Sequence, residues 1–350
     1  MIKATLNNDI LNAILSIEKN KDSLNAVDLP ANLSNRFRKN TKKRSSYSSN
    51  RMEGNPLTFE QAAEVIDAKN RHFLKPEQEI RNYYLALEFL EEKLKEKEAI
   101  SVKLLLEVQK LICAGESKEK IGLRGPMPPG VLFAVWNEDG TPSYIPPEWN
   151  EVKSLLDELI GYIDRSDDHP LIKAAIIHYQ LVTIHPFEDG NGRTARILSS
   201  YYLSLQGYGF KNVGSLEEYM SYDMDEYYSS IQMNLPVSYY EGRNDPPHPE
   251  IWISYFLRIF RIYASKVLSI ALREVKNNDE ERLSHLSPKA KAFLEYLKKK
   301  SIRRFAPIDL TSEFQVTNRT IINWCAELAN NGYLKPLLVN KRIRQYEVLM

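Results

Sequence analysis

Apolar residues recur every three to four positions along most of this chain, which is the pattern of amphipathic helices. The two clearest stretches flank a short polar segment near the middle. Before it, apolar side chains share one helical face at Ile172, Ala175, Ile176, Tyr179 and Val182. After it, the same period continues until Gly207 at Ile197, Leu198, Tyr201, Tyr202 and Leu205. The pattern therefore predicts a mainly α protein in which a loop at 184–196 joins two helices.

One segment breaks the helical pattern and is typical of strands. Residues 131–136 are β-prone, residues 137–140 have the composition of a turn, and residues 141–145 return before two prolines at 146–147 end the segment. The sequence therefore predicts a β-hairpin inserted between helices. Further helical periodicity is found over 58–99, 102–112, 217–235 and 251–274.

The C-terminal region differs from the rest in charge. Residues 281–350 carry 13 Lys and Arg against 6 Asp and Glu, a net charge of +7, whereas the whole chain has a net charge of +1. Their order of helices followed by a basic hairpin resembles a winged helix-turn-helix domain. Such a domain at 285–350 would bind DNA with Lys341, Arg342 and Arg344 on phosphates, or would serve as a packing or protein-docking module.

Length and composition place the chain among ordinary globular proteins. Its 350 residues predict two or three domains, and a hydrophobic content of 43% is sufficient for a core. We expect an N-terminal helical region at 1–100, a core at 101–240, a closing helix and linker at 241–280, and the C-terminal domain at 281–350.

Cysteine usage and hydropathy favour a cytoplasmic protein. Cys113 and Cys325 are the only cysteines, which fits a reducing compartment without a disulfide framework. The N-terminus lacks the pattern of a signal peptide, and no apolar run approaches the roughly 18 residues of a membrane span. We therefore expect no membrane association, with export by another route as the alternative.

The central loop collects the side chains of a phosphate-handling site. His185 can take up a proton near neutral pH, and Pro186 ends the first helix and biases His185 toward an extended backbone. Gly190 and Gly192 permit sharp bends that expose backbone amides. Asp189 beside such amides is a natural ligand for Mg²⁺, which binds carboxylate and phosphate oxygens.

The start of the second helix adds positive charge to this loop. Its first turn presents free N–H groups and the positive end of the helix dipole. Arg193 and Arg196 are three residues apart, so they share one helical face over that turn. Base, carboxylate, amides and two arginines together predict a site for phosphoryl or nucleotidyl transfer.

The run from His185 to Arg196 resembles the motif of the Fic family (filamentation induced by cyclic AMP), His-Pro-Phe-x-(Asp/Glu)-Gly-Asn-Gly-Arg-x-x-Arg, at every fixed position. The resemblance implies a Fic helical core that transfers AMP from ATP, with Mg²⁺, to a Tyr, Thr or Ser hydroxyl of a target protein. It also implies His185 as the base, Phe187 as the anchor of the loop and Asp189 as the metal ligand.

The same resemblance assigns the contacts to the phosphates. It implies that Asn191 and the amides of Gly190 and Gly192 bind the α- and β-phosphates, with Arg193 and Arg196 on the outer ones. The related Doc branch, which phosphorylates its target, has Lys where this chain has Gly192. That difference favours AMP transfer here.

A second motif lies far upstream of the loop. Many Fic proteins carry a regulatory helix with the pattern (Ser/Thr)-x-x-x-Glu-(Gly/Asn), which Ser49, Glu53 and Gly54 match. The resemblance implies that Glu53 pairs with Arg196 and blocks the γ-phosphate site. A carboxylate can do so because it competes with phosphate for a guanidinium. We therefore expect an autoinhibited enzyme.

The resemblance also suggests partners. In Fic proteins a hairpin at the place of 131–145 is a flap that binds the target protein by strand addition. Tyr228 and Ile231 correspond to the family's adenine pocket. Tyrosines near the site are candidates for self-modification, and enzymes of this family are often homodimers.

Two other functions fit the same residues. Glu53, held near the metal, would activate water and remove AMP from a modified protein, which would make the chain a de-AMPylase. Alternatively, the chain is a DNA-binding regulator that uses 285–350 and keeps the Fic loop as a nucleotide sensor.

Overall fold

The computed structural model describes residues 2, 6–68, 71–136, 139–236, 245–339 and 342–349. The chain divides into two compact units, Met1–Ala271 and Leu272–Met350. Both consist mainly of helices, so the prediction of a mainly α protein is confirmed. Among the described residues, none of the helices combines the length and apolar character that a bilayer crossing requires.

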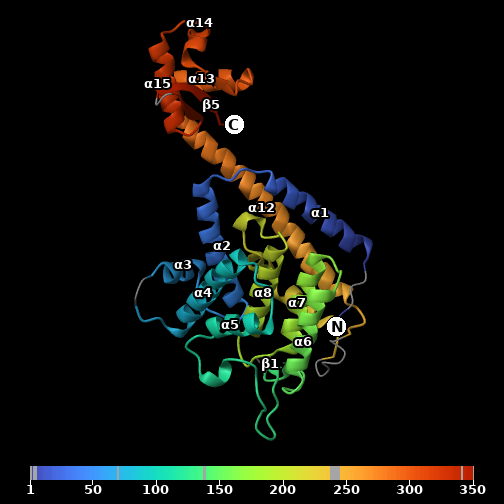
Figure 1. Ribbon diagram of the computed structural model, residues 1–350. Helices are drawn as coiled ribbons and strands as arrows, with labels where there is room; N and C mark the ends of the chain where they lie inside the picture. Colours follow the sequence, from blue (N-terminus) through green and yellow to red (C-terminus); the bar gives the residue numbers. More distant parts are fainter. Residues whose placement is uncertain are drawn as a thin grey trace. The chain divides into compact units, whose positions relative to one another are not determined.

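The N-terminal unit is a set of packed helices with one small hairpin (Figure 1). In chain order its elements are α1 (Asn8–Asn25), α2 (Ala31–Arg51), α3 (Phe59–Asp67), α4 (Lys75–Lys95), α5 (Val102–Ile112), η1 (Lys118–Lys120), β1 (Val135–Trp136), β2 (Pro142–Tyr144), α6 (Val152–Arg165), α7 (Pro170–Ile184), α8 (Asn191–Leu205), η2 (Phe210–Asn212), α9 (Leu216–Met220), α10 (Met224–Gln232) and the first part of α12 (Glu250–Ser284).

Helices α7 and α8 form the centre of this unit and pack along each other (Figure 1). From Leu171 to Ile184 every residue of α7 except Val182 is buried. The helix is therefore enclosed on all its faces, whereas the sequence predicted a single apolar stripe that included Val182. Helix α8 is buried from Arg193 to Ser199. The loop that joins two such helices is therefore held on both sides by the core.

Helix α2 lies against α4, α8 and α9. It follows Pro30, whose backbone is extended, and it is capped by Met52. Gly54 has a φ of +82°, a left-handed conformation that glycine adopts without strain, and the amide of Asn55 donates back to the Asn50 carbonyl at 3.1 Å. Residues 49–54 are thus the C-terminal end of α2 and the turn that follows it.

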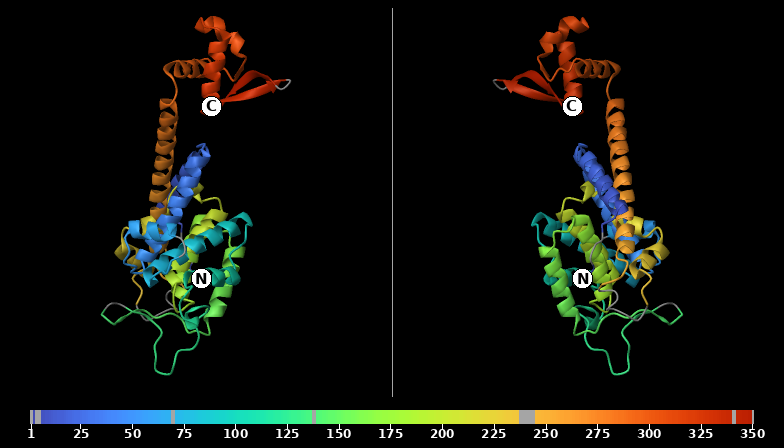
Figure 2. Two further views of the ribbon diagram at one scale, coloured as in Figure 1. Left: turned by 90° about the vertical axis from the view of Figure 1, so that its left-hand side faces the viewer. Right: turned by 90° about the vertical axis from the view of Figure 1, so that its right-hand side faces the viewer.

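The predicted hairpin is present but its paired part is shorter than expected. Only Val135–Trp136 and Pro142–Tyr144 pair, in an antiparallel arrangement, and the turn residues 137 and 138 lie outside the described residues. Val131 and Leu132 are about half exposed, so they have no core to pack on, and short two-stranded hairpins are marginal by themselves. The chain around β1 and β2 projects from one end of the helices (Figure 2).

Helix α12 is longer than the sequence predicted. We expected a helix over 251–274 and a charged spacer at 277–281, yet the helix continues to Ser284. An ion pair between Lys276 and Glu280, four residues apart at 3.7 Å, is one contact that supports the continuation.

The C-terminal unit has its own hydrophobic core, which includes Phe293, Leu297, Ile321 and Leu328. Its sheet has the order β3-β5-β4, and both pairings are antiparallel. Its elements are α13 (Pro288–Lys299), β3 (Arg304–Phe305), η3 (Pro307–Leu310), α14 (Thr311–Phe314), α15 (Asn318–Asn330), β4 (Leu334–Val339) and β5 (Arg342–Val348). Lys341 and the side chain of Arg342, two of the three expected phosphate contacts, lie outside the described residues.

Candidate functional site: a loop between two buried helices

His185 ends α7 in a left-handed conformation, with φ 50° and ψ 58°. The expectation of an extended backbone before Pro186 is therefore wrong. Proline disfavours the right-handed helical region for the residue before it. The left-handed region also avoids that conformation, and histidine is among the residues that adopt it. The His185 amide still donates to the Leu181 carbonyl at 3.2 Å, so the turn closes the helix.

The His185 ring is set up as a neutral base. Its Nδ1 lies 3.2 Å from the Val182 carbonyl, which can only accept, so Nδ1 carries the proton and Nε2 has a free lone pair. Burial lowers the pKa of His185 to about 4, against an opposing effect of the Val182 hydrogen bond. The ring is half-buried and meets Phe133 edge to face at 6.0 Å.

Arg124 connects the loop to the hairpin, a role that the sequence reasoning missed. Its backbone amide donates to the Pro186 carbonyl at 2.9 Å and its Nε donates to the His185 carbonyl at 2.8 Å. Its Nη2 donates to the carbonyl of Pro147, just after β2. Arg124 is buried. The sequence feature that could have pointed to Arg124 is its position as the single charged residue between Gly122 and Pro126, in an otherwise apolar stretch.

Phe187 and Asn191 fix the shape of the loop. Phe187 is fully buried, as expected for an anchor. The Asn191 side chain accepts from the Phe187 amide at 3.0 Å and donates to the Phe187 carbonyl at 2.8 Å. Because this side chain is engaged within the loop, a phosphate contact from Asn191 would come from its main chain.

Asp189 lies among positive groups at the edge of the loop. Its Oδ1 is 2.8 Å from Arg193 Nη2, and its Oδ2 is 3.6 Å from Lys120 Nζ. Gln109, which is buried, donates to the carbonyls of Asp189 and Lys120 at 3.2 and 2.7 Å. The sequence did not indicate the contacts of Gln109 and Lys120 with Asp189. A polar residue in a helix or a connecting segment is common, and its type alone does not identify its partner.

The start of α8 fits a polyphosphate. Gly190 has a φ of +82° and leads into a first turn whose N–H groups have no partner within the helix. Arg193 is 5% exposed, and its Nε has no hydrogen-bond partner. Among the described residues, no cluster of three or more His, Cys, Asp or Glu side chains is arranged to hold a metal. Asp189 is the carboxylate beside this turn, and Mg²⁺ is commonly held by one or two carboxylates together with phosphate oxygens.

The ion pair expected between Glu53 and Arg196 is present. Glu53 Oε1 lies 2.6 Å from Arg196 Nη2. The Ser49 hydroxyl and carbonyl accept from Arg196 Nε and Nη2 at 2.9 and 2.8 Å. Burial acts to lower the pKa of Arg196, but the carboxylate of Glu53 outweighs it and the net pKa is raised. The arginine is thus a charged group neutralised by the end of α2.

Glu53 also covers Gly192. A Cβ placed on Gly192 would lie 2.3 Å from Glu53 Oε1 and 3.1 Å from Arg196 Nη1. The carboxylate therefore occupies the space directly above the first turn of α8, where an anion would bind to the free amides.

Tyr228, one of the two residues expected at an adenine pocket, lies beside the same end of α2, because its hydroxyl donates to the Met52 carbonyl at 2.9 Å. Ile231, the other one, is buried on α10. Tyr227 was not singled out from the sequence, yet its hydroxyl lies 2.8 Å from His178 Nε2. Burial lowers the pKa of His178 to about 3, so this ring is neutral as well.

Comparison with known proteins identifies the domain that contains this loop. Residues 99–203 match the model of the Fic/DOC family. Curated relatives named protein adenylyltransferase Fic are 27% identical in both Drosophila virilis, over 201 residues, and Drosophila melanogaster, over 199 residues. The matches cover 56% and 55% of this chain but only 39% and 38% of those proteins.

Solved structures show the same fold. A Fic family protein from Desulfovibrio desulfuricans G20 has a TM-score of 0.64 at 20% identity, with 100% of this chain and 98% of that chain covered. Fic-1 from C. elegans has a TM-score of 0.56 at 21% identity, with 77% of this chain and 73% of that chain covered.

Proposed function

Because residues 99–203 match the model of the Fic/DOC family, we propose that this chain is a protein adenylyltransferase, which transfers AMP from ATP to a Tyr, Thr or Ser hydroxyl of a target protein. The single observation that carries the proposal is the contact of Glu53 with Arg196 above Gly192. In this contact the Glu53 carboxylate occupies the position proposed for an outer phosphate of ATP. Arg196 and the free amides at the start of α8 are suited to bind an anion there.

His185 is the general base of the proposed reaction. The target hydroxyl oxygen attacks the α-phosphorus of ATP, the bond from that phosphorus to the bridging oxygen breaks, and pyrophosphate leaves. The proton of the hydroxyl goes to Nε2 of His185, which is free because Nδ1 faces the Val182 carbonyl. A pKa of about 4 keeps this nitrogen unprotonated at neutral pH, so its lone pair is available to the target hydroxyl.

The other residues bind and orient ATP. The amides at the start of α8 and the guanidinium of Arg193 would hold phosphate oxygens, and Asp189 would hold Mg²⁺, which neutralises charge on the leaving group. Tyr228 and Ile231 would border the adenine. The exposed edge of the hairpin at 131–145 would hold the target segment by strand addition.

In the proposed resting state the enzyme inhibits itself. With Glu53 on Arg196, the outer phosphate of ATP loses Arg196 as a partner and meets a like charge instead. Release of the end of α2 would expose Arg196 and permit productive binding. We keep AMP removal by Glu53-activated water as the second candidate, because 35% of the Glu53 side chain remains exposed and one of its oxygens is outside the ion pair.

The test uses ATP labelled at either of two phosphates. Purified Glu53→Gly protein is incubated with Mg²⁺, cell lysate and ATP labelled at the α- or the γ-phosphate. AMP transfer predicts protein labelling from the α-labelled nucleotide only, and none in Glu53→Gly/His185→Ala. Labelling from the γ-phosphate would mean phosphorylation. With no labelling from either nucleotide, loss of AMP from a pre-modified protein in the wild type but not in Glu53→Gly would instead establish the second candidate.

A further inference from the structure

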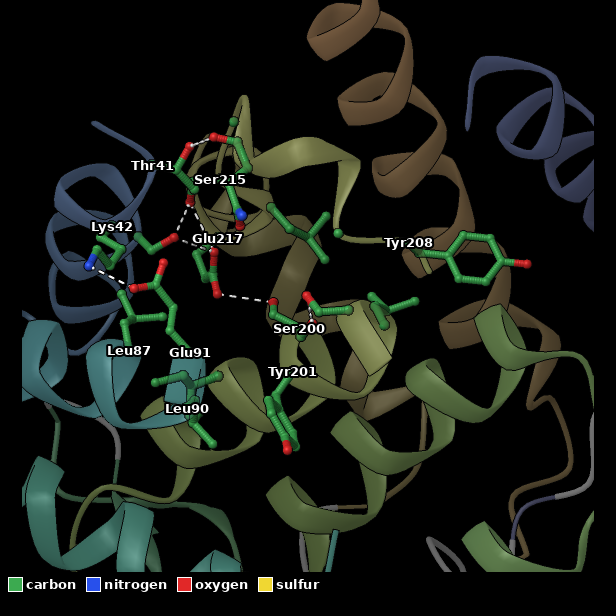
Figure 3. A pocket seen from close by; sticks show the side chains of 18 of the residues that line it. Thr41, Lys42, Leu87, Leu90, Glu91, Ser200, Tyr201, Tyr208, Ser215 and Glu217 are labelled. Carbon is green, nitrogen blue, oxygen red and sulfur yellow. Dashed lines mark hydrogen bonds and ion pairs between the residues drawn. The ribbon is translucent and has the colours of Figure 1, made fainter. Parts of the chain in front are cut away.

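A cavity of about 110 Å³ lies between α2, α4, α8 and α9, away from the loop at 184–196 (Figure 3). Since one water needs only about 10–15 Å³ of such space, the cavity can take a small organic molecule. Its walls are largely apolar, with Leu87, Leu90 and Ile197 among them. A mostly apolar cavity with a few convergent polar groups is the usual form of a small-molecule site.

The polar end of this cavity is Glu217, which is 2% exposed. Ser200 donates to its Oε1 at 3.0 Å, and the hydroxyls of Ser45 and Ser215 lie 2.9 Å from its Oε2 (Figure 3). All three partners are neutral, and the structure records no ion pair to Glu217 among the residues it describes. Buried charges are normally paired with an opposite charge.

The one lysine that lines the cavity is already engaged. Lys42 Nζ lies 3.1 Å from Glu88 and 3.0 Å from Glu91, and Glu91 also lines the cavity. The lining residues Glu91, Glu217 and Lys42 thus leave a net negative charge around an apolar space. The charge and shape together favour a ligand with an apolar body and a single positive group.

Glu217 also holds α2, the helix whose C-terminal end leads into Glu53. Ser45 precedes Ser49 by one helical turn on α2, and Ser200 follows Arg196 by one turn on α8. The bonds of Glu217 to Ser45 and Ser200 therefore form a second connection between the two helices, one turn away from the contact of Ser49 with Arg196.

We propose that this cavity is a regulatory site for a small alkylammonium compound, which binds Glu217, loosens α2 and so withdraws Glu53 from Arg196. The inference rests on the proposed function, since it requires Glu53 to be inhibitory. The apolar walls hold the alkyl chain, and the ammonium group competes with Ser45 for the carboxylate. The ammonium group brings a positive charge to this buried carboxylate, which its three neutral hydroxyl partners do not.

The binding test uses n-butylammonium as the probe and n-butanol as its neutral counterpart, with the full chain, in saturation-transfer NMR. We expect saturable binding of n-butylammonium, little of n-butanol, and about tenfold weaker binding of the cation by Glu217→Gln. Ser204→Ala, which changes a cavity residue that does not touch Glu217, should bind as the wild type does. Absent binding, or equal binding by Glu217→Gln, overturns the proposal.

The regulatory test measures protein labelling from α-labelled ATP. We expect n-butylammonium to raise labelling by the wild type toward that of Glu53→Gly, and Ser200→Ala to raise it without ligand, whereas Ser204→Ala does not. Binding without any rise in labelling overturns the regulatory role. If Glu53→Gly itself labels no protein, the result counts against the proposed function. If Glu53→Gly labels protein but n-butylammonium does not raise labelling by the wild type, the result counts against this inference alone.

Discussion

At the scale of single residues, the proposed chemistry depends on a half-buried histidine that is neutral. The loop supplies His185 with an acceptor for Nδ1 and lowers its pKa to about 4. An ordinary histidine, with a pKa near 6.5, would lose half of its base form at a slightly acid pH. His185 has no such loss over the physiological range.

This pKa has a consequence for the pH dependence of labelling. In Glu53→Gly, the rate of AMP transfer should stay level from about pH 8 down to about pH 5.5, because His185 remains unprotonated there. Initial rates from α-labelled ATP across this range would measure it. A decline in rate that follows the protonation of a single group with a pKa near 6.5 would mean that the His185 ring titrates as an exposed histidine does.

The same pKa shifts affect stability in a defined direction. His178 and His185 have folded-state pKa values of about 3 and 4, below the value in an unfolded chain. The unfolded state therefore takes up protons first, and the free energy of unfolding falls as the pH drops from about 6.5 toward these values.

Gly192 offers a second residue-scale prediction. An alanine there would place its Cβ against the Glu53 carboxylate, and that flexible side chain would have to leave. Gly192→Ala alone should therefore label more protein than the wild type. Comparison of Gly192→Ala/Glu53→Gly with Glu53→Gly shows whether the methyl group itself obstructs ATP. No gain in the single variant, with full labelling in the double variant, would contradict displacement of Glu53.

At the scale of elements, Arg124 joins three segments that are distant in sequence. It holds the carbonyls of His185 and Pro147 and, through its amide, that of Pro186. Loss of its side chain leaves two carbonyls near a buried site without donors, at a cost of about 1–3 kcal/mol for each one that is buried. The position of His185 relative to the hairpin should change with it.

Arg124→Met should therefore lower both the melting temperature and, in the Glu53→Gly background, the maximal labelling rate, with a smaller effect on the KM for ATP. Arg124→Lys should recover part of the rate because one donor returns. Lys103→Gln, a change of an exposed side chain on α5, serves as the control. If Arg124→Met has a normal labelling rate and only a lower melting temperature, the role of Arg124 is structural.

The sequence was informative where the chemistry is contiguous. The loop at 184–196 and the motif at 49–54 could be interpreted because each is a short run whose residue types constrain one another. The roles of Arg124, Gln109 and Glu217 could not be predicted, since each of them acts through a partner that is 61 to 172 residues away in sequence. The short pairing of the hairpin likewise depends on exposure, which composition alone does not give.

At the scale of the whole molecule, the C-terminal unit has its own core and a positive charge, and its binding of DNA stays a prediction. If three cations contact phosphates, the affinity of the full chain for duplex DNA should fall with salt at a log–log slope of roughly −3. Fluorescence anisotropy at several salt concentrations measures it. Arg344→Gln should reduce the slope by about one, and absence of binding at low salt would contradict the prediction.

The central claim is that Glu53 inhibits AMP transfer by its contact with Arg196, and comparison of Glu53→Gly with the wild type tests it most directly. A hydrogen bond between charged groups contributes about 1.5–3 kcal/mol, which corresponds to about 10- to 150-fold in rate. We predict a rise of that size in protein labelling from α-labelled ATP when Glu53 is replaced by glycine. Equal labelling by the two proteins would contradict the account.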